Sequence, residues 1–351
     1  MANHFENLSS ERIVVTGGAG FIGSTIVRRL LQLGASVIVL DDFFTGNERN
    51  LPIGHSCLEV VRGSVTNFRL VRDVIRDVTI VIHEAARNII VSTRDPREDC
   101  EVNVKGTLNV LLAVRDSRVR RTVYASTSSV YGNPRYLPIN EDDGVNTLNP
   151  YSVSKCAGEN YCKAFYESYG VSTAIVRYSN VYGPGQRPDN AYCGVVAKFF
   201  QAAMDGAPLQ IHGDGEETRD YTYIDDAVEA TLLAAFSAKA EGQVFNVGTG
   251  RETTVNQLAR MVLGATRAQV EPVYVDRRDI DNIRRRVLNI EKIRRELRWI
   301  PLVTLERGLQ ATYKWLLANR TTPTADSVGV PRYGTQLHDG SQPETVSSEI
   351  A

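Results

Sequence analysis

The chain has 351 residues, 42% of them hydrophobic and 23% charged, and can bury a sizeable core as one large or two closely joined domains. Its 40 Lys and Arg nearly balance 41 Asp and Glu, which excludes a chain-wide field that would recruit nucleic acid or an anionic membrane. No signal peptide or membrane-helix pattern is present, so we expect a cytoplasmic location. Five cysteines without a CxxC pair argue against a disulfide framework and a metal site.

Short apolar runs, rich in β-branched residues, alternate with amphipathic segments from residue 12 onwards. The runs occupy residues 13–15, 37–40, 60–61, 80–82, 122–124 and 173–176. This alternation predicts an α/β fold with a doubly wound parallel sheet of the Rossmann type. Because such sheets bind ligands beyond the carboxyl ends of their strands, we expect the chemistry at those ends.

The domain boundaries follow from the point at which this alternation loosens. We expect a Rossmann domain over residues 12–180 and a smaller, mainly substrate-binding lobe over residues 181–317. Residues 220–250 are expected to return to the first domain, with a strand near 244–246. Residues 321–351 are rich in Ser, Thr, Pro and Gly and poor in apolar residues, which predicts a disordered tail.

A glycine-rich turn joins the first predicted strand to the first predicted helix. The turn contains Gly17, Gly20 and Gly23, and its helix begins near Phe21 and Ile22. Glycines between a strand and a helix let backbone N–H groups and the helix N-terminus approach a pyrophosphate closely. The turn therefore predicts a dinucleotide-binding site.

The second predicted strand ends at Asp41, shortly after this turn. An acidic side chain there accepts hydrogen bonds from an adenosine ribose diol and repels a 2′-phosphate, which favours NAD over NADP. A role as a helix cap or turn residue is the alternative for Asp41.

A phenol and an ammonium group are predicted to share one face of a helix. Tyr151 and Lys155 are four residues apart and follow Pro150, which suits the first position of a helix. A free tyrosine has a pKa of about 10, but a nearby Lys⁺ and a positive nicotinamide ring both favour the phenolate. Tyr151 would then take a hydroxyl proton while hydride leaves for NAD. An ordinary surface pair is the alternative.

Residues 16–23, TGGAGFIG, resemble the fingerprint of the extended short-chain dehydrogenases, the family of the nucleotide-sugar epimerases and dehydratases, and the similarity continues to about residue 317. Residues 83–86, 103–107, 125–132 and 177–184 resemble further motifs of that family.

The resemblance implies that Ala85 and Asn103 line the NAD channel and that Tyr178 packs near the nicotinamide. It also implies that the hydroxyl of Thr127 bonds to the sugar oxygen being oxidised. Ser64 stands where many members carry an Asp that contacts adenine.

The same resemblance implies a nucleotide-sugar pocket. Asn180 is expected to bind the substrate diphosphate, and Arg219 is expected to hold it with a planar guanidinium. Arg187 belongs to a GPxxRPD stretch and is expected to bind substrate. Arg278, in the basic run 277–286, is expected to be the second diphosphate-binding arginine, with the other arginines of the run on a solvated face.

Ser128 and Ser129 separate the possible reactions. Related dehydratases carry Asp-Glu at these two positions, and UDP-glucuronate decarboxylases typically carry Glu at the second. Because hydroxyls cannot serve as general acid and base at neutral pH, we expect epimerisation at C4 of the sugar. A decarboxylase or dehydratase, a net oxidoreductase and a non-catalytic dinucleotide-binding protein stay as alternatives.

The sequence motifs point to two different sugars as substrate. Asn180 favours UDP-glucose and UDP-galactose, whereas residues 127–132 and 183–189 also resemble UDP-glucuronate 4-epimerases, in which three hydroxyls could hold a carboxylate. Family members commonly dimerise through two helices of each subunit, and residues 96–114 and 151–169 are the corresponding segments of this chain.

Overall fold

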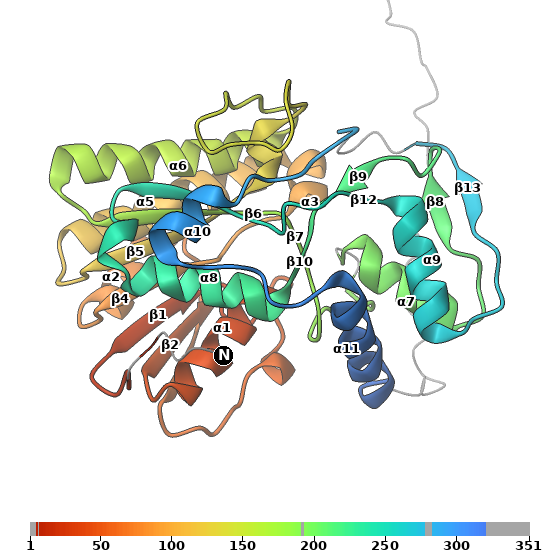
Figure 1. Ribbon diagram of the computed structural model, residues 1–351. Coiled ribbons are helices and arrows are strands. Elements are labelled where there is room, and N and C mark those ends of the chain that lie inside the picture. Colours follow the sequence, from red (N-terminus) through yellow and green to blue (C-terminus); the bar gives the residue numbers. More distant parts are fainter. Residues whose placement is uncertain (1–4, 6, 191–192, 278–282, 321–351) are drawn as a thin grey trace, which may run out of the picture.

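The computed structural model describes residue 5 and residues 7–190, 193–277 and 283–320 (Figure 1). Its central sheet has seven parallel strands in the spatial order β11, β6, β5, β4, β1, β2, β3. They are β1 (Arg12–Thr16), β2 (Ser36–Asp41), β3 (Leu58–Arg62), β4 (Ile80–His83), β5 (Arg121–Thr127), β6 (Thr173–Tyr178) and β11 (Gln243–Val247). The strand order reverses between β1 and β4, which confirms the doubly wound fold and places the ligand crevice beyond that point.

Helices cover both faces of this sheet because the strands are apolar on both sides. Ile13 and Val15 of β1 belong to one buried core, and Val14 between them belongs to the other. The first core is covered by α1 (Phe21–Gln32) and α8 (Ile224–Phe236), and the second by α2 (Phe68–Ile75), α5 (Gly106–Arg115) and α6 (Pro150–Tyr169). Between β4 and α5 lie α3 (Ile89–Arg94), α4 (Pro96–Asp99) and a π-helical turn (Cys100–Lys105).

A smaller lobe lies beside the sheet (Figure 1). It contains α7 (Val195–Met204), α9 (Val255–Thr266), α11 (Leu305–Ala318), β8 (Gln210–His212) and β13 (Val273–Val275). Short strands β7 (Asn180–Tyr182), β10 (Tyr221–Tyr223), β9 (Thr218–Arg219) and β12 (Thr253–Thr254) connect it to the sheet, and α10 (Glu291–Leu297) packs on β11. Short 3-10 turns span Glu48–Asn50, Ser128–Tyr131 and Ala238–Ala240. In the described segments, no helix has the length and apolar character needed to cross a bilayer.

The ends of helix α6 are set by local sequence. Asn149 and Ser152 form a reciprocal capping box, and Pro150 occupies the first turn, where its missing N–H costs nothing. Gly170 ends the helix in the left-handed conformation, with φ of 66°. Gly158 lets the helix approach the sheet, because a Cβ there would lie 2.2 Å from the hydroxyl of Tyr124.

A buried ion pair fastens α6 to the sheet. Arg177 of β6 donates two parallel hydrogen bonds to Glu159 of α6, at 2.6 and 2.8 Å, and both side chains are 2% exposed. Ser126 of β5 donates to the same carboxylate at 2.5 Å, and Arg177 also reaches the Tyr131 hydroxyl at 2.7 Å. Burial by itself lowers the pKa of Arg177, but Glu159 outweighs it and holds that pKa above its ordinary value.

Removing one partner of this pair should destabilise the protein strongly. Arg177→Met leaves the buried Glu159 carboxylate without its hydrogen-bonded counter-charge, which should lower the free energy of unfolding by about 3–5 kcal/mol. The matched control is Lys105→Met in the exposed Lys105–Glu101 pair, which should cost at most about 0.5 kcal/mol. Urea unfolding measures both, and equal losses in the two variants would contradict the role of the buried pair.

Candidate active site

Glycine is required at two positions of the turn and helix start that follow β1. Gly17 has a φ of 67°, and a Cβ on it would lie 2.7 Å from the backbone nitrogen of Ala85. A Cβ on Gly23 would lie 2.2 Å from the carbonyl oxygen of Gly17. Helix α1 begins with Gly20 as its N-cap, which contributes no side-chain hydrogen bond to the first-turn N–H groups. The helix therefore presents backbone donors and positive dipole charge to an anion.

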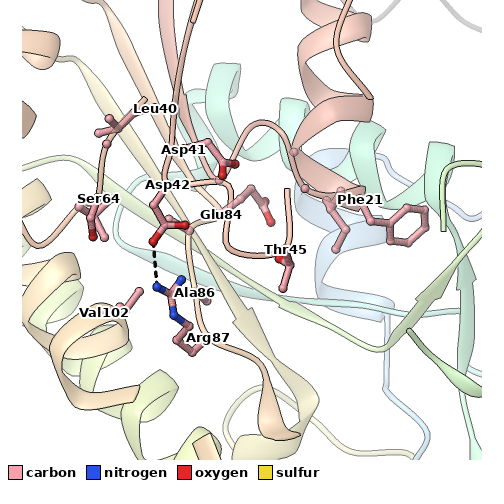
Figure 2. Close-up of a pocket in the computed structure, with 17 residues that line it drawn as sticks. Phe21, Leu40, Asp41, Asp42, Thr45, Ser64, Glu84, Ala86, Arg87 and Val102 are labelled. Carbon is pink, nitrogen blue, oxygen red and sulfur yellow. Dashed lines mark hydrogen bonds and ion pairs between the residues drawn. The ribbon is translucent and has the colours of Figure 1, made fainter. Parts of the chain in front are cut away.

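A cavity of about 230 Å³ opens in front of this turn, beyond the carboxyl ends of β1, β2 and β4 (Figure 2). Its walls include residues predicted for the cofactor: Gly17, Gly20, Phe21, Ile22, Asp41 and Ala85. Ser64 also lines it, at the expected adenine end beside Leu40. A glycine cradle, an uncapped helix N-terminus and a carboxylate at the end of β2 together fit NAD.

Asp41 is a turn residue and also lines the cavity, and its expected hydrogen bonds to a ribose stay a prediction. Its carboxylate accepts hydrogen bonds from the backbone N–H groups of Ala19 at 2.8 Å and of Phe43 at 2.7 Å, and the second is an Asx turn. Burial raises the pKa of Asp41, and these two hydrogen bonds oppose the rise. The same side chain lines the cavity, so it both shapes the loop and faces the ligand space.

Arg87 was missed by sequence reasoning. It is the single cation among the described residues that line the cavity, and its guanidinium is 2.8 Å from Asp42 and 2.8 Å from Glu98 (Figure 2). Because two carboxylates already hold it, it is poorly placed to receive a 2′-phosphate, which agrees with NAD rather than NADP.

Asn103 holds the backbone of Arg87 beside this cavity, and its expected place in the NAD channel stays a prediction. It is 1% exposed and is not among the residues that line the cavity. Its amide accepts from the N–H of Arg87 at 2.7 Å and donates to the carbonyl of Arg87 at 3.0 Å and to Asp99 at 2.6 Å. The π-helical turn thus uses its buried Asn103 to fix the backbone beside the cavity wall, because a buried amide needs these partners.

Three candidate catalytic residues lie near the cavity. Thr127 ends β5, Tyr151 lies in the first turn of α6, and Lys155 lies one turn further on. Burial raises the pKa of Tyr151 to about 12, with Asp99 and Glu84 adding to the rise and Thr127 and Arg286 opposing it.

Lys155 is buried, and its ammonium lies 4.4 Å from the centre of the Tyr124 ring. Burial lowers the pKa of Lys155, and Glu84, Glu159 and Asp99 oppose the change. Thr127 and Arg286 oppose the rise of the Tyr151 pKa, and the expected contribution of Lys155 stays a prediction.

Arg286 is the second residue that sequence reasoning missed. Its guanidinium is buried, with Nη1 3.5 Å from the hydroxyl of Ser129. Backbone hydrogen bonds from Ile139 to Val287 and from Asn289 to Ile139 hold this segment against the core. The apolar pair Val287–Leu288 was the available signal that the basic run turns inward at this point.

The other arginines of the run lie on the surface, as expected, and pair with acidic residues. Arg277 lies 3.2 Å from Glu217, Arg284 lies 2.8 Å from Asp214, and Arg285 lies 2.5 Å from Glu252. Arg278, the predicted second diphosphate ligand, lies outside the described residues.

The remaining predicted residues fall into two groups. Tyr178 ends β6 and donates a hydrogen bond to Glu84 of the cavity wall. Ser128 and Ser129 are buried in the turn after Thr127. The following residues lie further out, towards the smaller lobe: Asn180 at the start of β7, Arg187 paired with Asp189 at 3.3 Å, and Arg219 held by the carbonyls of Thr218 and Ile283 at 2.8 Å each.

Comparisons with known proteins agree with this site. The model of the NAD dependent epimerase/dehydratase family matches residues 13–248. A UDP-glucose 4-epimerase of Mycolicibacterium smegmatis is 39% identical over 309 residues, covering 87% of this chain and 98% of that protein. A UDP-glucuronate 4-epimerase of Thermodesulfobacterium geofontis is 31% identical over 321 residues, covering 87% and 96%.

A solved structure is similar as well. The crystal structure of UDP-glucose 4-epimerase from Thermotoga maritima with UDP-glucose matches with a TM-score of 0.84 and 36% identity, covering 88% of this chain and 99% of that one. These findings confirm the resemblance and the expectation of NAD as cofactor. The chain belongs to the NAD-dependent epimerase/dehydratase family.

Proposed function

We propose that this protein is an NAD-dependent nucleotide-sugar 4-epimerase that interconverts UDP-glucose and UDP-galactose. The observation that carries the proposal is the hydrogen bond between Thr127 and Tyr151, together with the electrostatic interaction of Tyr151 with Glu84 of the cavity wall. Positions 128 and 129 carry hydroxyls instead of carboxyls. The similarity to UDP-glucose 4-epimerases supports the choice of sugar.

The proposed reaction has no net redox change. NAD, when bound, accepts the C4 hydride of the sugar and gives it back to the opposite face. Tyr151 takes the proton of the C4 hydroxyl as the hydride leaves and returns it in the second half of the reaction. Thr127 hydrogen-bonds to Tyr151 and orients the sugar oxygen for that transfer. Asn180, Arg187, Arg219 and Arg278 stay proposed ligands of the nucleotide-sugar.

Dehydration or decarboxylation fits this site less well. Both reactions need acid or base groups beyond the tyrosine, and buried serine hydroxyls at positions 128 and 129 do not ionise near neutral pH. A ketone formed at C4 is therefore most simply reduced again, and the hydride returns to either face.

A second substrate is favoured by one specific observation. The hydroxyls of Thr127, Ser128 and Ser129 stand together at the end of β5, and the Arg286 guanidinium lies 3.5 Å from that of Ser129, so this end of the strand offers several donors to a carboxylate. UDP-glucuronate is therefore the second candidate, and the similarity to a UDP-glucuronate 4-epimerase supports it.

Tyr151→Phe tests the proposed chemistry. The variant keeps the ring and loses the proton acceptor, so epimerisation should fall by about 10³-fold. Proton NMR of the anomeric and C4 signals follows UDP-glucose, UDP-galactose and UDP-glucuronate in separate mixtures with added NAD. Tyr136→Phe, at a tyrosine that is 79% exposed and lies outside α5 and α6, is the matched control and should keep full activity. A decarboxylated or dehydrated product from the unmodified protein would contradict the proposed function.

Arg286→Met separates the two sugars. If the guanidinium binds a hexuronate carboxylate, kcat/KM should fall by about 10²-fold more for UDP-glucuronate than for UDP-glucose. Arg285→Met removes a charge from the exposed neighbour that pairs with Glu252 and serves as the control. Equal losses for the two sugars would show that Arg286 does not recognise a carboxylate.

We also propose that the protein is a homodimer joined through α5 and α6. Helix α6 exposes the apolar side chains of Val153 (53%) and Tyr161 (37%), as expected of an interaction surface. Leu111 of α5 is buried in the core of its own chain, so it is not available to a partner subunit. Light scattering should give twice the mass of one chain, and Val153→Asp should shift the protein towards the monomer. A monomeric unmodified protein would exclude this interface. The cytoplasmic location stays a prediction.

A further inference from the structure

Glu84 is a carboxyl group at the cavity for which the proposed chemistry has no use. It directly follows β4, and its side chain lines the cavity (Figure 2). The Tyr178 hydroxyl donates to its Oε1 at 2.9 Å, and the Thr231 hydroxyl lies 2.5 Å from that of Tyr178. This chain of hydroxyls, anchored on α8, ends on the carboxylate and fixes its position.

The other acidic residues of the cavity wall already have hydrogen-bond partners of their own. Asp41 and Asp42 both stand at the end of β2, where Asp41 is bound by backbone N–H groups and Asp42 by Arg87. Among the described lining residues, Glu84 is the one carboxyl that comes from the end of β4. It interacts electrostatically with Tyr151 and Lys155, which places it on the catalytic side of the cavity.

The charge of Glu84 is not cancelled by its histidine neighbour. His83 is buried between the hydroxyls of Thr16, at 2.7 Å, and Thr107, at 3.0 Å. Burial lowers the pKa of His83 to about 3, so the ring is neutral. Burial raises the pKa of Glu84 to about 7, while the Tyr178 hydrogen bond and Lys155 oppose the rise. Above that pH the carboxylate is ionised.

The position of the reacting ring follows from the site. Hydride moves between the sugar and the nicotinamide, and Glu84 both lines the cavity and interacts electrostatically with Tyr151, so a ring bound within reach of a sugar at Tyr151 would lie near Glu84. The ring is positively charged when oxidised and neutral when reduced. A fixed negative charge beside it therefore stabilises one redox state over the other.

We propose that Glu84 is the counter-charge of the nicotinamide ring and biases the bound cofactor towards NAD⁺ over NADH. Glu84 is thus a positioning residue, since it exchanges no atom with the substrate. Because the carboxylate stabilises the oxidised ring relative to the reduced one, it favours return of the hydride to the ketone. The enzyme then does not accumulate as an inactive NADH complex. The inference rests on the proposed function only for the placement of the ring next to Tyr151.

The test measures which cofactor the protein retains. The full-length protein is equilibrated at about pH 8.5 with an equal mixture of NAD and NADH, and the bound nucleotides are separated and quantified by absorbance, without any sugar present. Glu84→Gln keeps the shape and the acceptor for Tyr178 but removes the charge. It should lower the ratio of bound NAD to bound NADH by about tenfold.

Two further variants decide whether the charge acts. Glu84→Asp keeps a carboxylate at this position, so the ratio should stay within about threefold of the unmodified protein. Glu98→Gln, which removes the same charge from a partner of Arg87, should leave the ratio unchanged. A Glu84→Gln ratio equal to that of the unmodified protein, or an equal shift in Glu98→Gln, overturns the proposal.

The outcome does not depend on the sugar. If the ratio shifts as expected and no nucleotide-sugar is epimerised, Glu84 is the counter-charge of the ring and the proposed function is wrong. If epimerisation occurs and the ratio does not move, the proposed function stands and the role of Glu84 is refuted.

Discussion

The buried ion pair between Glu159 and Arg177 is the constraint on which the site depends. Tyr151 and Lys155 can act only if α6 lies at one height and one rotation over the sheet, and apolar packing alone tolerates small shifts of a helix. The two parallel hydrogen bonds between Arg177 and Glu159 allow one arrangement of the helix over the sheet. Ser126 and Tyr131 add hydrogen bonds to the same pair. Tyr131 continues the connection to Asn246 of β11 at 2.6 Å. These hydrogen bonds thereby join β5, β6 and β11, which are distant in sequence, beneath helix α6.

Burial also shapes this site, because it works against the charge states that the chemistry needs. It raises the pKa of Tyr151 and of Glu84 and lowers that of Lys155. Charges from separate elements act on these shifts. Arg286, from the segment before α10, opposes the rise at Tyr151. Glu84, from the end of β4, opposes the fall at Lys155 and adds to the rise at Tyr151. The proposed mechanism therefore relies on a balance of buried charges rather than on the Tyr–Lys pair alone.

The sequence predicted those parts of the protein that depend on local pattern. The strand runs, the glycine turn and the start of α6 follow from residues close together in the chain, and the structure has all three. Arg286 was not predicted, because a run of arginines gives no local sign of which one enters the core. Glu84 and Arg87 were also not assigned roles, since their partners lie far away in sequence: Tyr178 is 94 residues from Glu84, and Asp42 is 45 residues from Arg87. The position of Asn103 beside the wall likewise depends on tertiary contacts.

Hydride leaving C4 of the sugar and returning to the same carbon within one closed site is the step on which the proposed function depends most. The most direct measurement uses UDP-glucose labelled with deuterium at C4 and follows the label in the product by NMR and mass spectrometry. We predict UDP-galactose that retains the deuterium at C4, with none in water and none in added NADH. Loss of the label to water, or its appearance in free NADH, would show that the protein removes a proton or releases reduced cofactor and would contradict the proposed function.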